Sequence, residues 1–176
     1  LILVVNDDGI SAPGIRKLIT IMKDFGEVVV VAPEGPQSGM GHAITINATL
    51  RCDKVTMDDG KQTEYSVSGT PVDCVKLAVN QIVKRKPDLC VSGINHGSNS
   101  SINVIYSGTM SAAVEGALEG IPSIGFSLLD FSHDADFSEG EKYIRKITKS
   151  VLKNDLPDGV CLNVNIPKSK ENEKIK

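Results

Sequence analysis

The chain has 176 residues, of which 40% are hydrophobic, and a formal net charge of −3 at pH 7. This length allows one domain over residues 1–176 with a hydrophobic core, and the nearly balanced charge argues against a protein dedicated to binding a nucleic-acid polymer. No apolar run approaches the roughly 20 residues that cross a bilayer, and residues 1–5 lack the basic region of a signal peptide. We therefore expect neither a membrane partner nor a leader.

Strand and helix patterns alternate along the chain. Short apolar runs predict strands at 1–5, 27–32, 88–92, 122–127 and 160–166. Helical patterns lie between them, at about 13–24, after Thr70-Pro71, at about 108–119 and from Ser138, which has Glu141 at capping-box spacing. This alternation predicts an α/β fold, a doubly wound and mostly parallel Rossmann-like sheet with helices on both faces.

The segment at about 44–68 breaks this alternation. Two partly polar, strand-like runs flank Asp58-Asp59-Gly60, a sequence that is typical of a solvated hairpin turn. We therefore predict a β-hairpin insertion at an edge of the sheet. The polar residues from Lys168 to Lys176 are expected to form a frayed end or the start of a further segment.

The opening strand runs directly into Asn6-Asp7-Asp8-Gly9. Adjacent carboxylates repel each other unless a cation neutralises them, and Mg²⁺ and Mn²⁺ prefer oxygen ligands. Ligands bind at the carboxyl ends of the strands in open α/β sheets, so we interpret this junction as a metal site at the catalytic edge. The alternative is a simple turn, because Asp-Gly is a common turn pair.

Two loops that follow predicted strands contain further oxygen donors. Residues 32–42 include three glycines and two prolines, and Ser38 offers a hydroxyl to a metal or a phosphate. An ordinary surface loop explains that segment equally well. Residues 91–99 contain Asn95 and Asn99, whose amide groups suit a metal or a phosphate. Turn formation is the alternative there, but the density of Gly, Asn, Ser and His favours a functional role.

Ser107-Gly108-Thr109 opens a predicted helix of small residues. The first N–H groups of a helix lack partners within the helix and attract anions, and Gly108 allows a close approach. N-capping by Ser107 or Thr109 is the alternative, and both roles can hold together. Histidine side chains can act as proton donors, which makes His42 and His96 candidates, but a lone histidine in such a glycine-rich loop is more often structural than catalytic.

Together these motifs resemble those of the survival protein E family, stationary-phase acid phosphatases also described as 5′/3′-nucleotidases. The resemblance is carried, in order and spacing, by residues 6–9, 32–42, 69–75, 92–97 and 107–109 and by Asn163-Val164-Asn165-Ile166-Pro167. It implies a cytoplasmic homodimer or homotetramer that hydrolyses nucleoside 5′-monophosphates, with 3′-monophosphates and polyphosphate as substrates to be compared. Family members usually continue into an arm that exchanges between subunits, whereas this sequence ends at Lys176.

The resemblance also implies the site residues. One divalent ion per subunit, Mg²⁺ or Mn²⁺, would be held by Asp7, Asp8, Ser38 and Asn95. The substrate phosphate would lie near Gly39, Asn95, Asn99, Ser107, Gly108 and Thr109. We expect a water molecule as the nucleophile, oriented or deprotonated by Asp7. A covalent aspartyl-phosphate on Asp7 or Asp8 is the less favoured alternative.

Two other protein classes share part of this pattern. A receiver-like signalling module that binds phosphate and metal also has an acidic pair after its first strand. It needs an acceptor aspartate after a central strand, where this chain has Ser92-Gly93-Ile94-Asn95. A dehalogenase-type phosphatase needs Asp-x-Asp, whereas here the two aspartates are adjacent. We therefore favour the phosphomonoesterase and keep the receiver-like module as the alternative.

Overall fold

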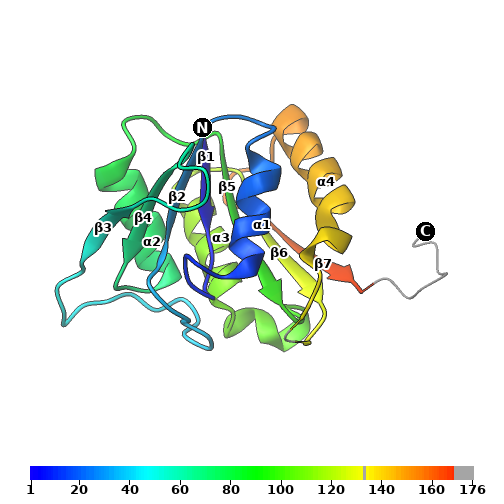
Figure 1. The fold of residues 1–176 in the computed structure, drawn as a ribbon, viewed down its shortest axis with the longest axis horizontal. Coiled ribbons are helices and arrows are strands. Elements are labelled where there is room, and N and C mark those ends of the chain that lie inside the picture. The colour runs from blue at the N-terminus through cyan, green and yellow to red at the C-terminus, as the bar shows by residue number, and fades with distance from the viewer. Residues whose placement is uncertain (133, 169–176) are drawn as a thin grey trace.

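The structure, a computed structural model, describes residues 1–132 and 134–168. These residues form a seven-stranded sheet in the order β3-β4-β2-β1-β5-β6-β7 (Figure 1). The strands are Ile2–Val5 (β1), Val28–Pro33 (β2), Cys52–Val55 (β3), Thr63–Val67 (β4), Leu89–His96 (β5), Ser123–Leu129 (β6) and Cys161–Pro167 (β7). β3 runs antiparallel to β4, and the other neighbouring strands are parallel. The predicted fold class is confirmed.

Two helices cover each face of the sheet. The helices are Pro13–Met22 (α1), Pro71–Leu77 (α2), Gly108–Leu118 (α3) and Glu141–Asn154 (α4), and shorter turns form at Ala78–Ile82 (η1), Ser101–Ile105 (η2) and Phe137–Gly140 (η3). α1 and α4 lie on one face and α2 and α3 on the other (Figure 1). Central strands such as β1 are buried on both faces, which explains their unbroken apolar sequence. None of the described helices is long and apolar enough to span a membrane.

The predicted hairpin insertion is confirmed at one edge of the sheet. β3 and β4 pair in antiparallel fashion, and exposed Asp58-Asp59-Gly60 lies between them. Asp58 and Gly60 have positive φ angles of 51° and 63°, as a tight turn requires. β4 also pairs in parallel with β2, so the insertion extends the main sheet. The tail from residue 169, for which a frayed end was predicted, lies outside the described residues.

The capping box predicted at Ser138 and Glu141 is wrong. Ser138 lies inside the 3₁₀ turn η3, where its backbone N–H donates to the side chain of Asp136 at 2.8 Å. α4 begins only at Glu141, whose carboxylate pairs with Lys17 at 2.5 Å and Arg145 at 2.8 Å. These two cations hold the carboxylate that the capping box would have turned back toward the backbone.

Candidate active site

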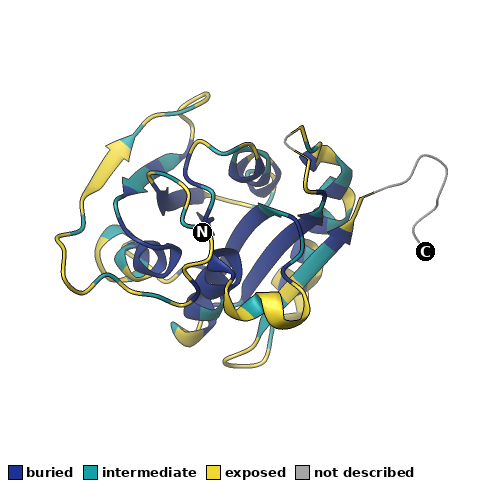
Figure 2. Ribbon diagram, turned by 90° about the horizontal axis from the view of Figure 1, so that it is seen from below, coloured by how far each residue is buried: buried dark blue, intermediate teal, exposed yellow. Residues whose placement is uncertain are grey.

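The predicted site residues gather at the carboxyl ends of the parallel strands. This edge is at the bottom of Figure 1 and faces the reader in Figure 2. A pocket of about 250 Å³ opens here. Its lining includes the predicted residues Asp7, Ser38, Gly39, Asn95, Asn99 and Ser107. Segments that are far apart in the sequence therefore meet at one site, as the fold prediction required.

Asp7 is the most buried acidic group of the site, with 5% of the residue exposed. Its Oδ1 accepts a hydrogen bond from the Thr109 hydroxyl at 2.5 Å. Burial raises the pKa of Asp7 above its ordinary value, while hydrogen bonds from Thr109 and from the backbone of Gly108 oppose that rise. The N-terminus of α3 is thus directed at the Asp7 carboxylate and stabilises its charged form.

Asp8 adjoins Asp7 and is partly exposed. Burial and the neighbouring Asp7 charge raise the pKa of Asp8 to about 6, and His96 acts in the opposite direction. Asp8 does not line the pocket in this structure, although it was predicted as a metal ligand beside Asp7. Asp8 therefore lies beside the pocket, next to Asp7 in the sequence, and its role as a ligand stays a prediction.

The donor set at this edge fits a hard divalent cation. No lysine or arginine pairs with Asp7 or Asp8 within residues 1–132 and 134–168, so hydrogen bonds to Asp7 and the nearby His96 offset only part of the cost of placing the two carboxylates together. The same residues contain no group of three or more His, Cys, Asp and Glu side chains that could hold a metal. A cation here would therefore rely on neutral oxygen donors in addition to the carboxylates, and Ser38 and Asn95 in the same pocket supply them.

Of the two interpretations of residues 107–109, N-capping is confirmed, and Ser107 provides the cap. Ser107 caps α3 by accepting a hydrogen bond from the Met110 N–H at 3.0 Å, and it also lines the pocket. Gly108 and Thr109 contact Asp7. A Cβ atom on Gly108 would lie only 2.6 Å from the Cβ atom of Asp7, so glycine is required for this close approach. Phosphate binding by these residues stays a prediction.

Asn95 reaches the pocket through an irregularity in β5. This strand continues to His96, four residues beyond the predicted end at 92. The pairing register with β6 shifts between Ser92 and Asn95, and Gly93 adopts a φ angle of 128°. A Cβ atom on Gly93 would lie 2.4 Å from the carbonyl oxygen of Phe126. The loop predicted at residues 91–99 therefore begins only after His96, and the residues before it form a distorted strand end. Such distortions redirect the side chains that follow.

His42 has the structural role that the sequence favoured. Its Nε2 lies 2.8 Å from Oε2 of Glu115, a buried residue of α3. Lys76 donates to the other oxygen of Glu115, also at 2.8 Å. His42 does not line the pocket. Instead, it connects the loop that carries Ser38 to the helix that carries Ser107.

The sequence did not predict four of the residues that line the pocket, namely His96, Ser98, Asn103 and Tyr106. Ser98 and Tyr106 adjoin predicted residues, so their position in the sequence was a usable signal. His96 was weighed and assigned a structural role, and its ring also contacts Phe137 edge-on at 4.7 Å. Asn103 lies in η2, and no local pattern indicates that this turn borders the pocket.

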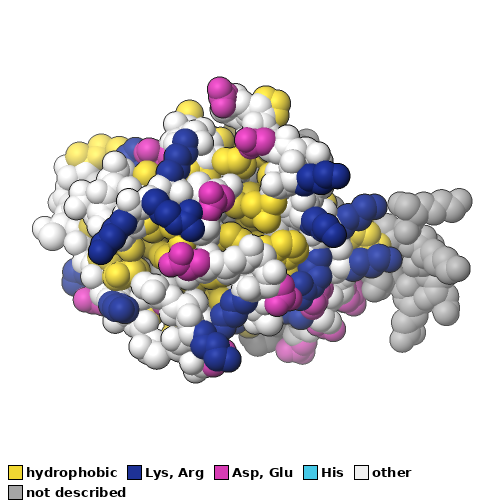
Figure 3. Space-filling view, turned by 90° about the horizontal axis from the view of Figure 1, so that it is seen from above, with side chains coloured by type: hydrophobic (Ala, Val, Ile, Leu, Met, Phe, Trp, Pro, Cys, Tyr) yellow, Lys and Arg dark blue, Asp and Glu magenta, His cyan; other side chains and the backbone are white. Residues whose placement is uncertain are grey.

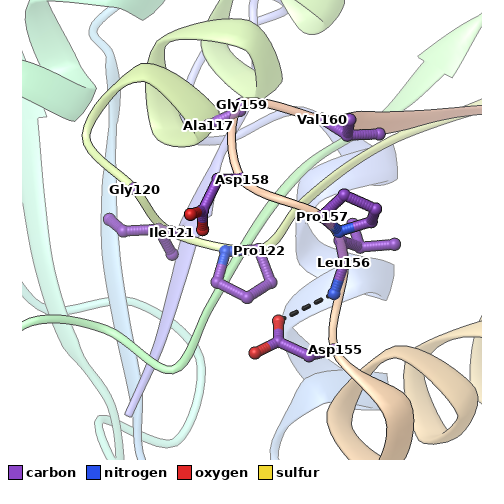
Figure 4. Close-up of a pocket in the computed structure, with 10 residues that line it drawn as sticks. All are labelled: Ala117, Gly120, Ile121, Pro122, Asp155, Leu156, Pro157, Asp158, Gly159 and Val160. Atoms are coloured by element: carbon purple, nitrogen blue, oxygen red, sulfur yellow. Dashed lines mark hydrogen bonds between the residues drawn. The ribbon is translucent and has the colours of Figure 1, made fainter.

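The other end of the sheet, where the parallel strands begin, carries none of the predicted site residues. A cavity of about 60 Å³ lies there, next to the starts of β6 and β7, lined by residues 117, 120–122 and 155–160 (Figure 4). Asp155 accepts a hydrogen bond from the Leu156 N–H at 2.7 Å in its wall. On this side of the molecule, Lys and Arg side chains are interspersed with Asp and Glu (Figure 3). The surface charges in this view therefore form no extended stripe of one sign.

The sequence matches the family model described as "Survival protein SurE" over residues 2–176. It is 71% identical over 173 residues to a protein named 5′-nucleotidase SurE from Flavobacterium johnsoniae, covering 98% of this chain and 67% of that protein. It is 70% identical over 174 residues to a protein of the same name from Christiangramia forsetii, with the same coverage of 98% and 67%.

Among solved structures, the crystal structure of the SurE protein from Aquifex aeolicus matches with a TM-score of 0.84 and 43% sequence identity. The match covers 94% of this chain and 65% of that one. The chain thus spans about two thirds of the length of the relatives it matches. The family match over nearly the whole chain and the high identities agree with the motifs at the pocket, and the chain belongs to the survival protein SurE family.

Proposed function

We propose that this chain carries the active site of a metal-dependent phosphomonoesterase that hydrolyses nucleoside 5′-monophosphates to nucleoside and phosphate. The observation that carries the proposal is one pocket in which an unneutralised buried carboxylate, Asp7, meets Ser38, Asn95 and the capped start of α3. The name 5′-nucleotidase SurE, borne by the relatives, supports this substrate class. Nucleoside 3′-monophosphates and polyphosphate are the further substrates to compare.

Asp7, Asp8, Ser38 and Asn95 would hold one Mg²⁺ or Mn²⁺ per chain. When bound, such a cation polarises a phosphoryl oxygen and makes a water molecule more acidic. The unpaired charges of Asp7 and Asp8 and the neutral oxygen donors opposite them support this assignment.

In this proposal Asp7 orients or deprotonates the attacking water. The hydrogen bond from Thr109 fixes the position of the Asp7 carboxylate, so the base does not need to reorganise during the reaction. Residues 107–109, Asn95 and Asn99 would surround the phosphoryl oxygens. The Asn95 amide already donates to the carbonyl oxygens of His96 and Gly97, and the Thr109 hydroxyl donates to Asp7. The Ser107 hydroxyl and the second N–H of the Asn99 amide would therefore be the side-chain donors to phosphate. Such fixed donors stabilise the charge that develops on these oxygens in the transition state.

We further propose that the protein assembles as a homodimer or homotetramer. Large apolar side chains are exposed on the segments that flank the pocket, namely Met40, Ile44, Ile46, Ile102 and Ile105. A group of exposed apolar side chains of this kind is typical of an interaction surface. Light scattering of the full-length protein measures the assembly directly, and a monomer at micromolar concentration would contradict this part of the proposal.

Phosphate release from a panel of nucleotides, with Mn²⁺ added, tests the function. We expect steady turnover by the wild type and a loss of at least about 100-fold in Asp8→Asn, because one anionic ligand is removed. Asp59→Asn is the matched control, since it makes the same change in the exposed Asp-Asp-Gly turn. Unchanged turnover after metal depletion would exclude the proposed mechanism. Stoichiometric phosphate uptake without turnover would instead favour a signalling module.

A further inference from the structure

Three asparagines connect the edge strand β7 to the pocket, and we call Asn99, Asn163 and Asn165 the asparagine ladder. Asn165 Oδ1 accepts a hydrogen bond from the Asn99 N–H at 2.9 Å. Asn163 Nδ2 donates to the carbonyl oxygen of Asn99 at 2.8 Å. Asn165 Nδ2 donates to Asn163 Oδ1, also at 2.8 Å. Both main-chain polar groups of Asn99 are therefore held by side chains that lie 64 and 66 residues away in the sequence.

The side chain of Asn99 is fixed as well. Its Nδ2 donates to Oγ of Ser127 at 2.9 Å, and Ser127 is fully buried in β6. Ser127 is the register partner of Asn165 in β7, so the two anchors of Asn99 lie side by side in the sheet. Asn99 itself is 6% exposed and lines the pocket. Two neighbouring strands thus define one position for a residue of the pocket.

In β7, the residues that pack against the core are not the residues that contact Asn99. Val164 and Ile166 pack against the core, whereas Asn163 and Asn165 are two residues apart and occupy the opposite face of the strand. An asparagine offers a donor and an acceptor on one short side chain, and the ladder needs both. Because the apolar residues already attach β7 to the sheet, the two asparagines are available for another role.

We propose that Asn163 and Asn165 are positioning residues for phosphate binding, which act by holding Asn99 in a single conformation at the pocket. This inference rests on the proposed function, because Asn99 belongs to the phosphate-binding set proposed there. Within residues 1–132 and 134–168, no hydrogen bond or ion pair joins Asp7, Asp8 or Ser38 to β7. Asn95, the fourth proposed metal ligand, lies opposite Ser127 in the sheet register, but its side-chain amide donates to the main chain of its own segment and not to β7. The ladder therefore supports the phosphate side of the site and leaves the binding of the metal unchanged.

The test uses Asn163→Ala and Asn165→Ala in the full-length protein. Binding of inorganic phosphate and of Mn²⁺ is measured by calorimetry, alongside kcat and KM for a nucleoside monophosphate. We expect phosphate affinity to fall about tenfold and KM to rise by a similar factor, as for the loss of one or two supporting hydrogen bonds. Mn²⁺ affinity should stay at the wild-type value.

Asn80→Ala is the matched control. Asn80 Nδ2 also donates to a main-chain oxygen, that of Lys76, at 2.8 Å, but on an exposed surface outside the pocket. We expect this variant to bind phosphate as the wild type does. Asn163→Asp keeps the size of the side chain but replaces the donor to Asn99 with an acceptor. It should therefore bind phosphate at least as weakly as Asn163→Ala.

Three results would overturn the inference. One is wild-type phosphate affinity in both alanine variants. Another is a parallel loss of phosphate affinity, Mn²⁺ affinity and thermal stability, which would show a general structural role. The third is a return to wild-type affinity in Asn163→Asp. Because binding is measured apart from turnover, a wild type that binds phosphate without hydrolysing nucleotides would overturn the proposed function alone. A wild type that binds no phosphate would overturn both.

Discussion

Gly108 sets how closely α3 approaches the end of β1. The helix can direct its first N–H groups and the Thr109 hydroxyl at Asp7 because position 108 has no side chain. The Asp7 carboxylate is consequently both buried and held in place, which suits a group that must orient a water molecule. A single residue without a side chain thus controls the geometry of the proposed base.

Gly108→Ala is expected to lower kcat about 100-fold, because the added methyl group must displace Asp7 and a shift of about 1 Å has an effect of that size. Gly35→Ala is the control, since a Cβ atom there would meet nothing within 4 Å. Initial rates and thermal melting of both variants provide the measurement. Activity of Gly108→Ala within threefold of the wild type would show that the close approach is not needed.

At the scale of elements, one arginine joins the hairpin insertion to helix α1. Arg16 of α1 donates to both carboxylate oxygens of Glu64 in β4, at 2.5 and 2.9 Å. It also donates to Asp58 in the hairpin turn at 2.8 Å. Glu64 is fully buried, so its charge depends on Arg16 for compensation.

Arg16→Ala should lower the free energy of unfolding by about 3 kcal/mol, because it leaves the buried Glu64 carboxylate unpaired. Arg51→Ala removes an exposed pair with Glu34 from the same insertion and should change stability by less than about 1 kcal/mol. Urea unfolding measures both values. The specific activity of folded Arg16→Ala should match that of the wild type. Equal destabilisation by the two variants would contradict this account of the insertion.

Across the whole molecule, the fold places two acidic residues, Asp7 and Asp8, at the carboxyl ends of the parallel strands. Asp7 and Asp8 are consecutive residues that directly follow β1, a strand buried on both faces, and the Asp7 charge raises the pKa of Asp8. The folded protein therefore carries an electrostatic cost in the absence of a cation. That cost makes stability depend on both pH and metal.

The direction of the pH effect follows from Asp8. Its pKa is raised from 3.8 to about 6 in the fold, so folding favours the protonated form, and stability falls as pH rises through this interval. Without metal, the free energy of unfolding of Asp8→Asn should exceed that of the wild type by about 1 to 2 kcal/mol at pH 7.5. This difference is already reduced to allow for the partial exposure of Asp8. At pH 4 the two free energies should be nearly equal.

Mn²⁺ at about 100 times its Kd should stabilise the wild type by about 2.7 kcal/mol at pH 7.5. The wild type should then be more stable than Asp8→Asn, the reverse of their order without metal. Urea unfolding with and without Mn²⁺ measures this reversal, with Asp59→Asn as the control. Equal stabilisation of the wild type and Asp8→Asn would place the ion elsewhere.

The sequence alone determined the order of strands and helices, the edge insertion and the edge of the sheet where the site lies. Those features are local: apolar runs reveal strands buried on both faces, and turn residues mark where the strands end. The family resemblance, confirmed by the comparisons, followed from motifs at those same ends. The single-domain boundaries and the catalytic, metal-binding and phosphate-binding roles of all the predicted site residues stay predictions.

Only the tertiary structure decided which side chains meet. In the structure the Thr109 hydroxyl donates to Asp7, and β5 continues past Ser92. Glu141 forms ion pairs with Lys17 and Arg145 instead of a capping box. The fold also joins Asn99 to a strand more than 60 residues later. The physical reason is that a sequence pattern reports burial and local backbone geometry. Hydrogen bonds between distant segments depend instead on the distances that packing of the whole sheet and its helices creates.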